Sequence, residues 1–274
     1  MKVILLTSKK PNQVALANRL AKVCELSAIV LSENVPQRRS PDANRIRAYQ
    51  VASRVVGRPF LQTWRDMMRH YEGRFPNLPE TRQVRVRNVN DAATTALIDE
   101  IKPDLVLVSG TNLVAKRVIE KCQQYGPILN LHTGISPYVK GGPNCTNWCL
   151  ATQQFHLIGN TIMWIDPGID TGALVTTERT SLTGRESLLE LHVAVMDHAH
   201  DLYARAVATV ARGAKLPRVE QSSLGAGTTF FTRDWNPLAM VRAQLGFRKF
   251  NANSIDRARE LAKGVKLVAL PAEG

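Results

Sequence analysis

The sequence contains no uninterrupted apolar run of about eighteen residues, the length that a helix needs to cross a membrane. The first residues, MKVILLTSKK, hold an apolar stretch too short for a secretory signal and are typical of a first strand. Hydrophobic residues make up 44% of the 274 residues, an ordinary fraction for a globular protein. We therefore expect no membrane partner and a cytoplasmic location.

The cysteine and histidine patterns of metal sites and disulfide frameworks are also missing. No pair of CxxC motifs exists, and no two histidines lie four residues apart on a predicted helix. The sequence therefore predicts reduced thiols and no metal site. The four cysteines are Cys24, Cys122, Cys145 and Cys149, of which the last two are interpreted as packing residues.

Acidic residues are scarce relative to basic ones. The chain has 36 Lys and Arg against 23 Asp and Glu, which gives a net charge of +13. Such a surplus favours anionic partners such as phosphates, polyglutamates or nucleic acid, and charge alone does not choose among them. Arginines are concentrated in residues 33–75, which we interpret as helices on an exposed insertion. A solvated basic face is the simpler interpretation of the same segment.

Short apolar runs alternate with segments of helical period along most of the chain. The expected strands cover residues 3–6, 27–31, 105–109, 127–131, 161–165 and 173–177, and the expected helices cover 12–25, 91–101, 113–123 and 183–213. The last helix would begin at a capping box of Thr183 and Glu186, and its histidines would be surface or half-buried residues. The pattern predicts an α/β fold with a Rossmann-like, mostly parallel sheet flanked by helices, followed by a short, mainly helical C-terminal extension.

Polar residues stand at the end of one expected strand and in a later loop. Asn130 and His132 lie two residues apart at the carboxyl end of strand 127–131, so their side chains point to the same side. Ligands of open α/β sheets bind at this end of the strands. The loop DPGIDTG, residues 166–172, adds Asp170. Asn130 could instead cap its loop, His132 could be a satisfied buried histidine, and Asp166 could only shape its turn.

The motifs Asn130-x-His132 and Pro137-x-x-x-Gly141, followed by IDPGIDTG at 165–172, resemble the folate-dependent formyltransferase family. That family includes methionyl-tRNA, glycinamide ribonucleotide and amino-sugar formyltransferases. The resemblance is strong over about residues 103–178. It implies an enzyme that uses N10-formyltetrahydrofolate as co-substrate, with a catalytic domain over residues 1–215 and a C-terminal extension over 216–274 packed on it.

The resemblance also assigns roles to residues. Asn130 would donate to the oxygen that becomes negative during formyl transfer, His132 would hold or pass a proton, and Asp170 would orient the imidazole. The folate-binding residues would be Val108, Gly110, Leu113, Trp164, Ile165, Asp166 and Gly168.

The resemblance implies a primary amine on a small molecule as the acceptor, and the sequence favours an anionic one. The first loop, TSKKPNQ at 7–13, has no glycine, unlike the phosphate loop of glycinamide ribonucleotide enzymes. The segment GGPNCTNW at 141–148 resembles a loop of sugar formyltransferases, so a nucleotide-linked amino sugar is the first choice. A methionyl-tRNA formyltransferase-like enzyme is the alternative, although the barrel domain usual in those enzymes has no room after residue 215. A non-catalytic nucleic-acid-binding protein on the same fold is the third hypothesis, and a homodimer is one option for assembly.

Overall fold

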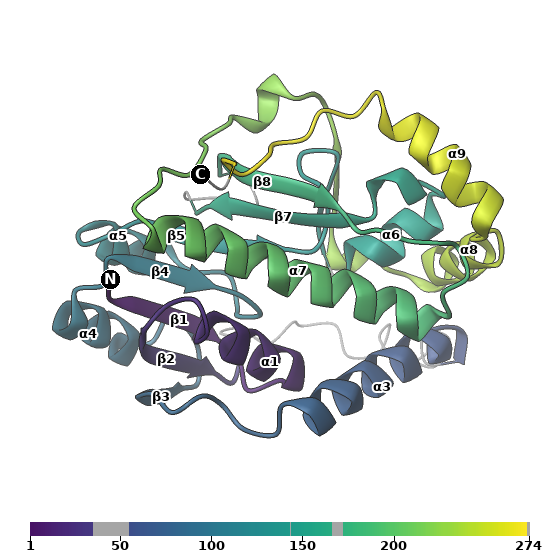
Figure 1. The fold of residues 1–274 in the computed structure, drawn as a ribbon. Helices are drawn as coiled ribbons and strands as arrows, with labels where there is room; N and C mark the ends of the chain where they lie inside the picture. Colours follow the sequence, from purple (N-terminus) through teal and green to yellow (C-terminus); the bar gives the residue numbers. More distant parts are fainter. Residues whose placement is uncertain (35–54, 143, 166–171, 273–274) are drawn as a thin grey trace.

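A computed structural model describes residues 1–34, 55–142, 144–165 and 172–272 (Figure 1). Within these ranges, a seven-stranded sheet forms the centre of the molecule, in the order β3-β2-β1-β4-β5-β7-β8. The neighbours from β3 to β5 are parallel, and the last two pairings, β5 with β7 and β7 with β8, are antiparallel. The strands are β1 Val3–Thr7, β2 Leu26–Ser32, β3 Gln83–Val86, β4 Leu105–Val108, β5 Ile128–His132, β7 Gly159–Trp164 and β8 Leu174–Arg179. The predicted Rossmann-like, mostly parallel sheet is confirmed.

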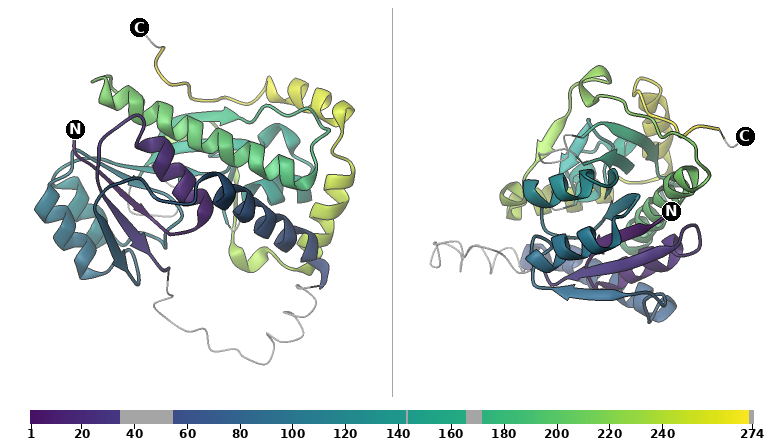
Figure 2. Two further views of the ribbon diagram at one scale, coloured as in Figure 1. Left: turned by 60° about the horizontal axis from the view of Figure 1, so that its bottom comes forward. Right: turned by 90° about the vertical axis from the view of Figure 1, so that its left-hand side faces the viewer.

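Helices cover both faces of this sheet (Figures 1 and 2). One face packs against α1 (Pro11–Leu20) and α7 (Leu188–Ala211), with α3 (Arg58–Arg74) beside them. The other face packs against α4 (Ala92–Ile101) and α5 (Lys116–Gln123). None of the described helices is long and apolar enough to span a membrane.

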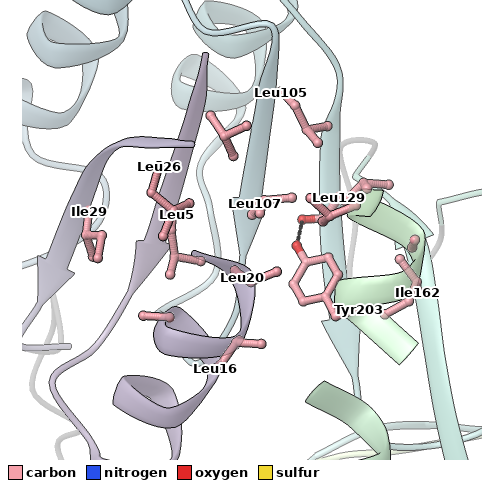
Figure 3. Packing of buried hydrophobic residues seen from close by; sticks show 14 of the residues in the cluster. Leu5, Leu16, Leu20, Leu26, Ile29, Leu105, Leu107, Leu129, Ile162 and Tyr203 are labelled. Atoms are coloured by element: carbon pink, nitrogen blue, oxygen red, sulfur yellow. Dashed lines mark hydrogen bonds between the residues drawn. The ribbon is translucent and has the colours of Figure 1, made fainter. Parts of the chain in front are cut away.

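Strand residues alternate between two hydrophobic cores. Leu5, Leu107 and Leu129 belong to the core on the α1 and α7 side, part of which Figure 3 shows. Ile4 and Val108 belong to the core on the α4 and α5 side. Because the central strands are buried on both faces, their sequences are continuous apolar runs, which is why they could be predicted.

Several elements differ from the prediction. The short edge strand β3 was missed because the exposed Arg85 within it and the exposed Arg87 just after it interrupt the apolar pattern. Helix α1 ends at Leu20, five residues early. The capping box of α7 consists of Ser187 and Glu190. Thr183 donates its backbone N–H and its hydroxyl to Glu186, but this pair closes a turn before the helix, so the predicted start was wrong.

Helix α3 corrects the interpretation of the basic segment. Residues 35–54 lie outside the described residues, but α3 is amphipathic and buries one face against α1 and α7. Its buried residues, Phe60, Thr63, Met67 and Tyr71, are spaced three or four apart. The arginines occupy the outer face, so this part of the segment is a packed helix and not an exposed insertion.

The C-terminal residues contact the loops that follow β5. Strand β9 (Thr228–Phe230) pairs in parallel with β6 (Val139–Gly141), and α8 (Pro237–Arg248) packs against α6 (Cys145–Ala151). Helix α9 (Ala252–Ala262) follows. The division of the chain at residue 215 stays a prediction.

Candidate active site

Asn130 and His132 lie together at the carboxyl end of β5. Their neighbours Leu129 and Leu131 face α7, so the alternation of the strand places Asn130 and His132 on the opposite face. Asn130 is in register with Val108, the last residue of β4. Both polar side chains are half-buried and reach solvent. The strand end thus presents an amide and an imidazole at an accessible edge.

The imidazole of His132 contacts a thiol. Its Nε2 atom lies 3.4 Å from Sγ of Cys145, the first residue of α6. Cys145 is buried, and its thiol also lies 3.6 Å from the carbonyl oxygen of Gly141. The sequence offered no period or motif that joins Cys145 to His132, so the contact was missed.

A buried tyrosine lies beneath the two strand ends. The hydroxyl of Tyr203, on α7, accepts the backbone N–H of Val108 at 3.0 Å. It also donates to the carbonyl of Leu129 at 2.7 Å (Figure 3). Burial raises the pKa of the Tyr203 phenol far above its usual range, so the hydroxyl keeps its proton. Tyr203 therefore links β4 and β5 directly before Asn130.

The turn after β4 holds two of the residues predicted to bind folate. Gly110 has a φ of +68°, and a Cβ there would lie 2.7 Å from Cδ of Gln13. Its carbonyl accepts the side-chain N–H of Asn34 at 2.9 Å. Leu113 is 64% exposed, so its side chain is accessible to a ligand at this edge of the sheet.

The other predicted folate residues do not all share one side. Ile165 packs against the same core as Val108, on the face of Asn130. Trp164 lies on the α7 face, where its indole N–H donates to the carbonyl of Pro217 at 2.9 Å. Asp166, Gly168 and Asp170 lie outside the described residues, so their positions stay predictions.

A basic cavity of about 290 Å³ lies at the carboxyl ends of β1 and β2, beside β3. It is lined by Ser8, Lys9, Lys10, Leu31, Ser32, Glu33 and Arg85. Three of these residues are cationic and one is acidic, so the cavity suits an anionic group. Within the described ranges, no group of three His, Cys, Asp or Glu side chains is arranged to hold a metal ion.

Comparisons with known proteins agree on one family. A family model described as formyl transferase matches residues 37–207. The methionyl-tRNA formyltransferase of Clostridium beijerinckii is 26% identical over 151 residues, which are 52% of this chain and 46% of that protein. The enzyme of the same name from Finegoldia magna is 30% identical over 122 residues, 44% of this chain and 38% of that protein. The matches thus span less than half the length of these curated relatives.

Solved structures show the same fold. A sugar N-formyltransferase from Shewanella sp FDAARGOS_354 aligns with a TM-score of 0.56 at 15% identity, covering 89% of this chain and 87% of that one. Phosphoribosylglycinamide formyltransferase from Bacillus halodurans aligns with a TM-score of 0.51 at 17% identity, covering 77% and 95%. At such low sequence identity, these structural similarities show a shared fold and nothing about the substrate.

Proposed function

This chain belongs to the formyl transferase family, as its motifs predicted, and on that premise we propose that it transfers a formyl group to a primary amine. The proposed donor is N10-formyltetrahydrofolate. The observation that carries the proposal is the pair of Asn130 and His132, which lie on one face at the accessible carboxyl end of β5. An amide donor and a titratable imidazole at one edge are the groups that acyl transfer requires.

Asn130 and His132 would have different roles in the transfer, one as a hydrogen-bond donor and the other as a proton acceptor. When an amine attacks the formyl carbon, negative charge develops on the formyl oxygen, and the Asn130 amide can donate an N–H to it without changing charge. The amine must also lose a proton, and a ring nitrogen of the His132 imidazole would accept it. We assign Asp170 the role of orienting the imidazole. The folate donor supplies the formyl group, and Val108, Gly110, Leu113 and Ile165 would line its pocket with backbone groups and apolar surface.

For the acceptor, we propose a nucleotide-linked amino sugar. The basic cavity beside β1, β2 and β3 supports this choice, because Lys9, Lys10 and Arg85 would bind phosphate oxygens at the sheet edge that carries Asn130. The second candidate acceptor is initiator methionyl-tRNA, since the curated relatives named above are methionyl-tRNA formyltransferases.

The test is an acceptor screen with N10-formyltetrahydrofolate, in which tetrahydrofolate release is followed. We expect release with an amino-sugar nucleotide, and a loss of about a hundredfold or more in kcat for His132→Ala at unchanged folding. Efficient formylation of methionyl-tRNA, with every amino-sugar nucleotide inert, would contradict the amino-sugar assignment and support methionyl-tRNA as the acceptor.

Calorimetry separates the catalytic proposal from nucleic-acid binding alone. A stable folate analogue should bind saturably, and RNA competitors should not displace it. A flat titration at millimolar analogue, with no turnover of any amine, would contradict formyl transfer from folate.

A further inference from the structure

We propose that Asn34 and Asn90 are positioning residues, because their side-chain amides hold the loop between β4 and α5, residues 109–115, in the conformation that binds the folate donor. The functional part of this inference rests on the proposed formyl transfer from folate. The structural part, the fixed conformation of the loop, can be measured without any ligand.

Asn34 holds the first half of the loop. It lies two residues after the end of β2, and its side-chain amide donates to the carbonyl of Gly110 at 2.9 Å. The same amide accepts the backbone N–H of Asn112 at 2.9 Å. Asn34 has a φ of +58°, a left-handed conformation that asparagine adopts more readily than most residues. One amide group thus binds a carbonyl and the N–H two residues further along the chain.

Asn90 holds the second half of the loop in the same manner. It is buried between β3 and α4, and its side-chain amide donates to the carbonyl of Leu113 at 2.9 Å. The same amide accepts the N–H of Ala115 at 2.7 Å, again two residues further along. The backbone carbonyl of Asn90 accepts a hydrogen bond from the guanidinium of Arg117 on α5. Asn90 therefore ties the loop both to the turn before α4 and to the helix that follows the loop.

A glutamine supports the loop from α1. The α-carbon of Gly110 lies so close to the side chain of Gln13 that an added Cβ would be 2.7 Å from its Cδ. The hydroxyl of Thr7, the last residue of β1, donates to Oε1 of Gln13 at 3.0 Å, so this glutamine is itself held in place. Both atoms of the Thr7–Gln13 hydrogen bond are buried. The loop is therefore fixed from α1 as well as from the segments after β2 and β3.

This arrangement fixes the backbone of Leu113 and leaves its side chain accessible. The carbonyl of Leu113 is bound by Asn90, whereas the side chain is 64% exposed. An apolar side chain on a backbone that is already ordered can cover a flat ring without the entropy cost of ordering a loop. A primary amide suits the supporting position because it offers a donor and an acceptor in one plane and carries no charge.

The first experiment measures the loop on the whole protein without ligands. Asn34→Gly keeps the left-handed backbone without strain and removes the amide, whereas Asn34→Asp keeps an acceptor for the N–H of Asn112. Solvent exchange of this N–H, followed by NMR, should become about two- to tenfold faster in Asn34→Gly, the change expected for one lost hydrogen bond. In Asn34→Asp it should stay close to the wild-type rate. Exchange in Asn34→Gly at the wild-type rate would overturn the structural part of the proposal.

The second experiment connects the loop to donor binding. Asn34→Gly and Asn90→Ala should each raise the Kd of a stable tetrahydrofolate analogue by about tenfold in calorimetry, because the loop must then be ordered on binding. The KM for N10-formyltetrahydrofolate should rise similarly, while kcat and the KM for the amine stay within about twofold of the wild type. An unchanged Kd in the Asn34→Gly protein, with faster exchange at Asn112, would overturn the positioning role.

Asn18→Ala is the matched control. Asn18 is half-buried like Asn34, and its side-chain amide also binds backbone, donating to the carbonyls of Val14 at 2.9 Å and Asn77 at 2.8 Å. These contacts join α1 to the segment before β3, so the variant should lose stability and keep the wild-type Kd of the analogue.

The remaining outcomes separate this inference from the proposed function. Equal losses of affinity in Asn18→Ala, Asn34→Gly and Asn90→Ala would show that the asparagines act only through overall stability, which would overturn the positioning role. A wild-type protein that binds no folate analogue, yet in which Asn34→Gly speeds the exchange of Asn112, would contradict the folate donor and leave the structural inference intact.

Discussion

At the scale of single residues, the candidate site depends on a side chain that comes from outside it. Tyr203 enters from α7 and is fully buried, and its hydroxyl joins Val108 on β4 to Leu129 on β5. Val108 and Asn130, which follow these contacts, are in register across the two strands. The hydroxyl therefore adds a side-chain link between the paired strands β4 and β5 next to Asn130.

Replacing Tyr203 with Phe should lower kcat by about tenfold or more while the protein still folds, because Asn130 would shift relative to the reacting oxygen. The free energy of unfolding should fall by about 1–3 kcal/mol, the cost of leaving buried backbone groups without their partner. Steady-state kinetics and denaturant unfolding measure the two effects.

The control is Tyr71→Phe. Tyr71 is also fully buried, and its hydroxyl donates to Asp197 at 3.1 Å on the α3 side of the molecule. This variant should lose stability and keep the wild-type kcat. If both tyrosine variants retain full kcat, Tyr203 has no positioning role.

The residues of the candidate site differ in how readily the sequence alone predicts them. The position of Asn130 and His132 at one strand end could be predicted, because they share one short motif after an apolar run, and their roles stay predictions. Tyr203 could not be predicted, because its contact with Leu129 joins residues that are 74 positions apart in the sequence. In the helical pattern of this segment, Tyr203 is only one more apolar residue. Cys145 was assigned to packing because only the folded loop brings its thiol to His132.

At the scale of elements, periodicity succeeded where one element buries a full face. The central strands and α4 were found within a few residues of their bounds. The short elements β6, β9 and α6 were not predicted, because three to seven residues show no period. Their positions depend on contacts between distant segments, such as the pairing of Val139 with Thr228.

The packing of α8 on α6 joins the C-terminal residues to the region of the candidate site. A substitution at their contact tests how tight this packing is. A Cβ at Gly246, within α8, would lie 1.8 Å from the backbone oxygen of Leu150 in α6. Backbone cannot give way as a flexible side chain can, so Gly246→Ala should lower the free energy of unfolding by about 1–3 kcal/mol. Chemical denaturation followed by circular dichroism measures this loss.

Gly73→Ala provides the opposite case. Gly73 lies in α3, and a Cβ there would meet nothing within 4 Å. This substitution should stabilise the protein by up to about 1 kcal/mol, because alanine is the better helix former. If Gly246→Ala were as well tolerated as Gly73→Ala, the close packing of α8 on α6 would be wrong.

At the scale of the whole molecule, burial of histidines on α7 links stability to pH. The sequence predicted surface or half-buried histidines there, which was wrong for His192 and His200. Both face inward, and burial lowers the pKa of His192 to about 4 and that of His200 to about 3. In the described part of the chain, neither ring nitrogen of His200 has a hydrogen-bond partner.

These lowered pKa values make the folded protein less stable in acid. An unfolded histidine takes up a proton near its ordinary pKa of 6.5, whereas burial of His200 in the folded protein lowers its pKa to about 3. Between these values the unfolded state binds more protons, so the free energy of unfolding should fall as pH drops below 6.5. Each such histidine contributes about 1.4 kcal/mol per pH unit within its window. Because the folded pKa of His192 is higher, its contribution ends near pH 4.

His200→Leu should remove one of these two contributions and flatten the dependence of stability on pH between about 6 and 4. Leucine has a similar volume and needs no hydrogen-bond partner, so the variant should fold and should be no less stable than the wild type at pH 5. Denaturant unfolding at several pH values gives the slope. Repulsion from the net charge of +13 also grows in acid, but it is nearly equal in both proteins and cancels in their difference. His70→Gln, on the outer side of α3, should leave the slope unchanged, and a His200→Leu slope equal to that of the wild type would show that His200 is not held neutral by burial.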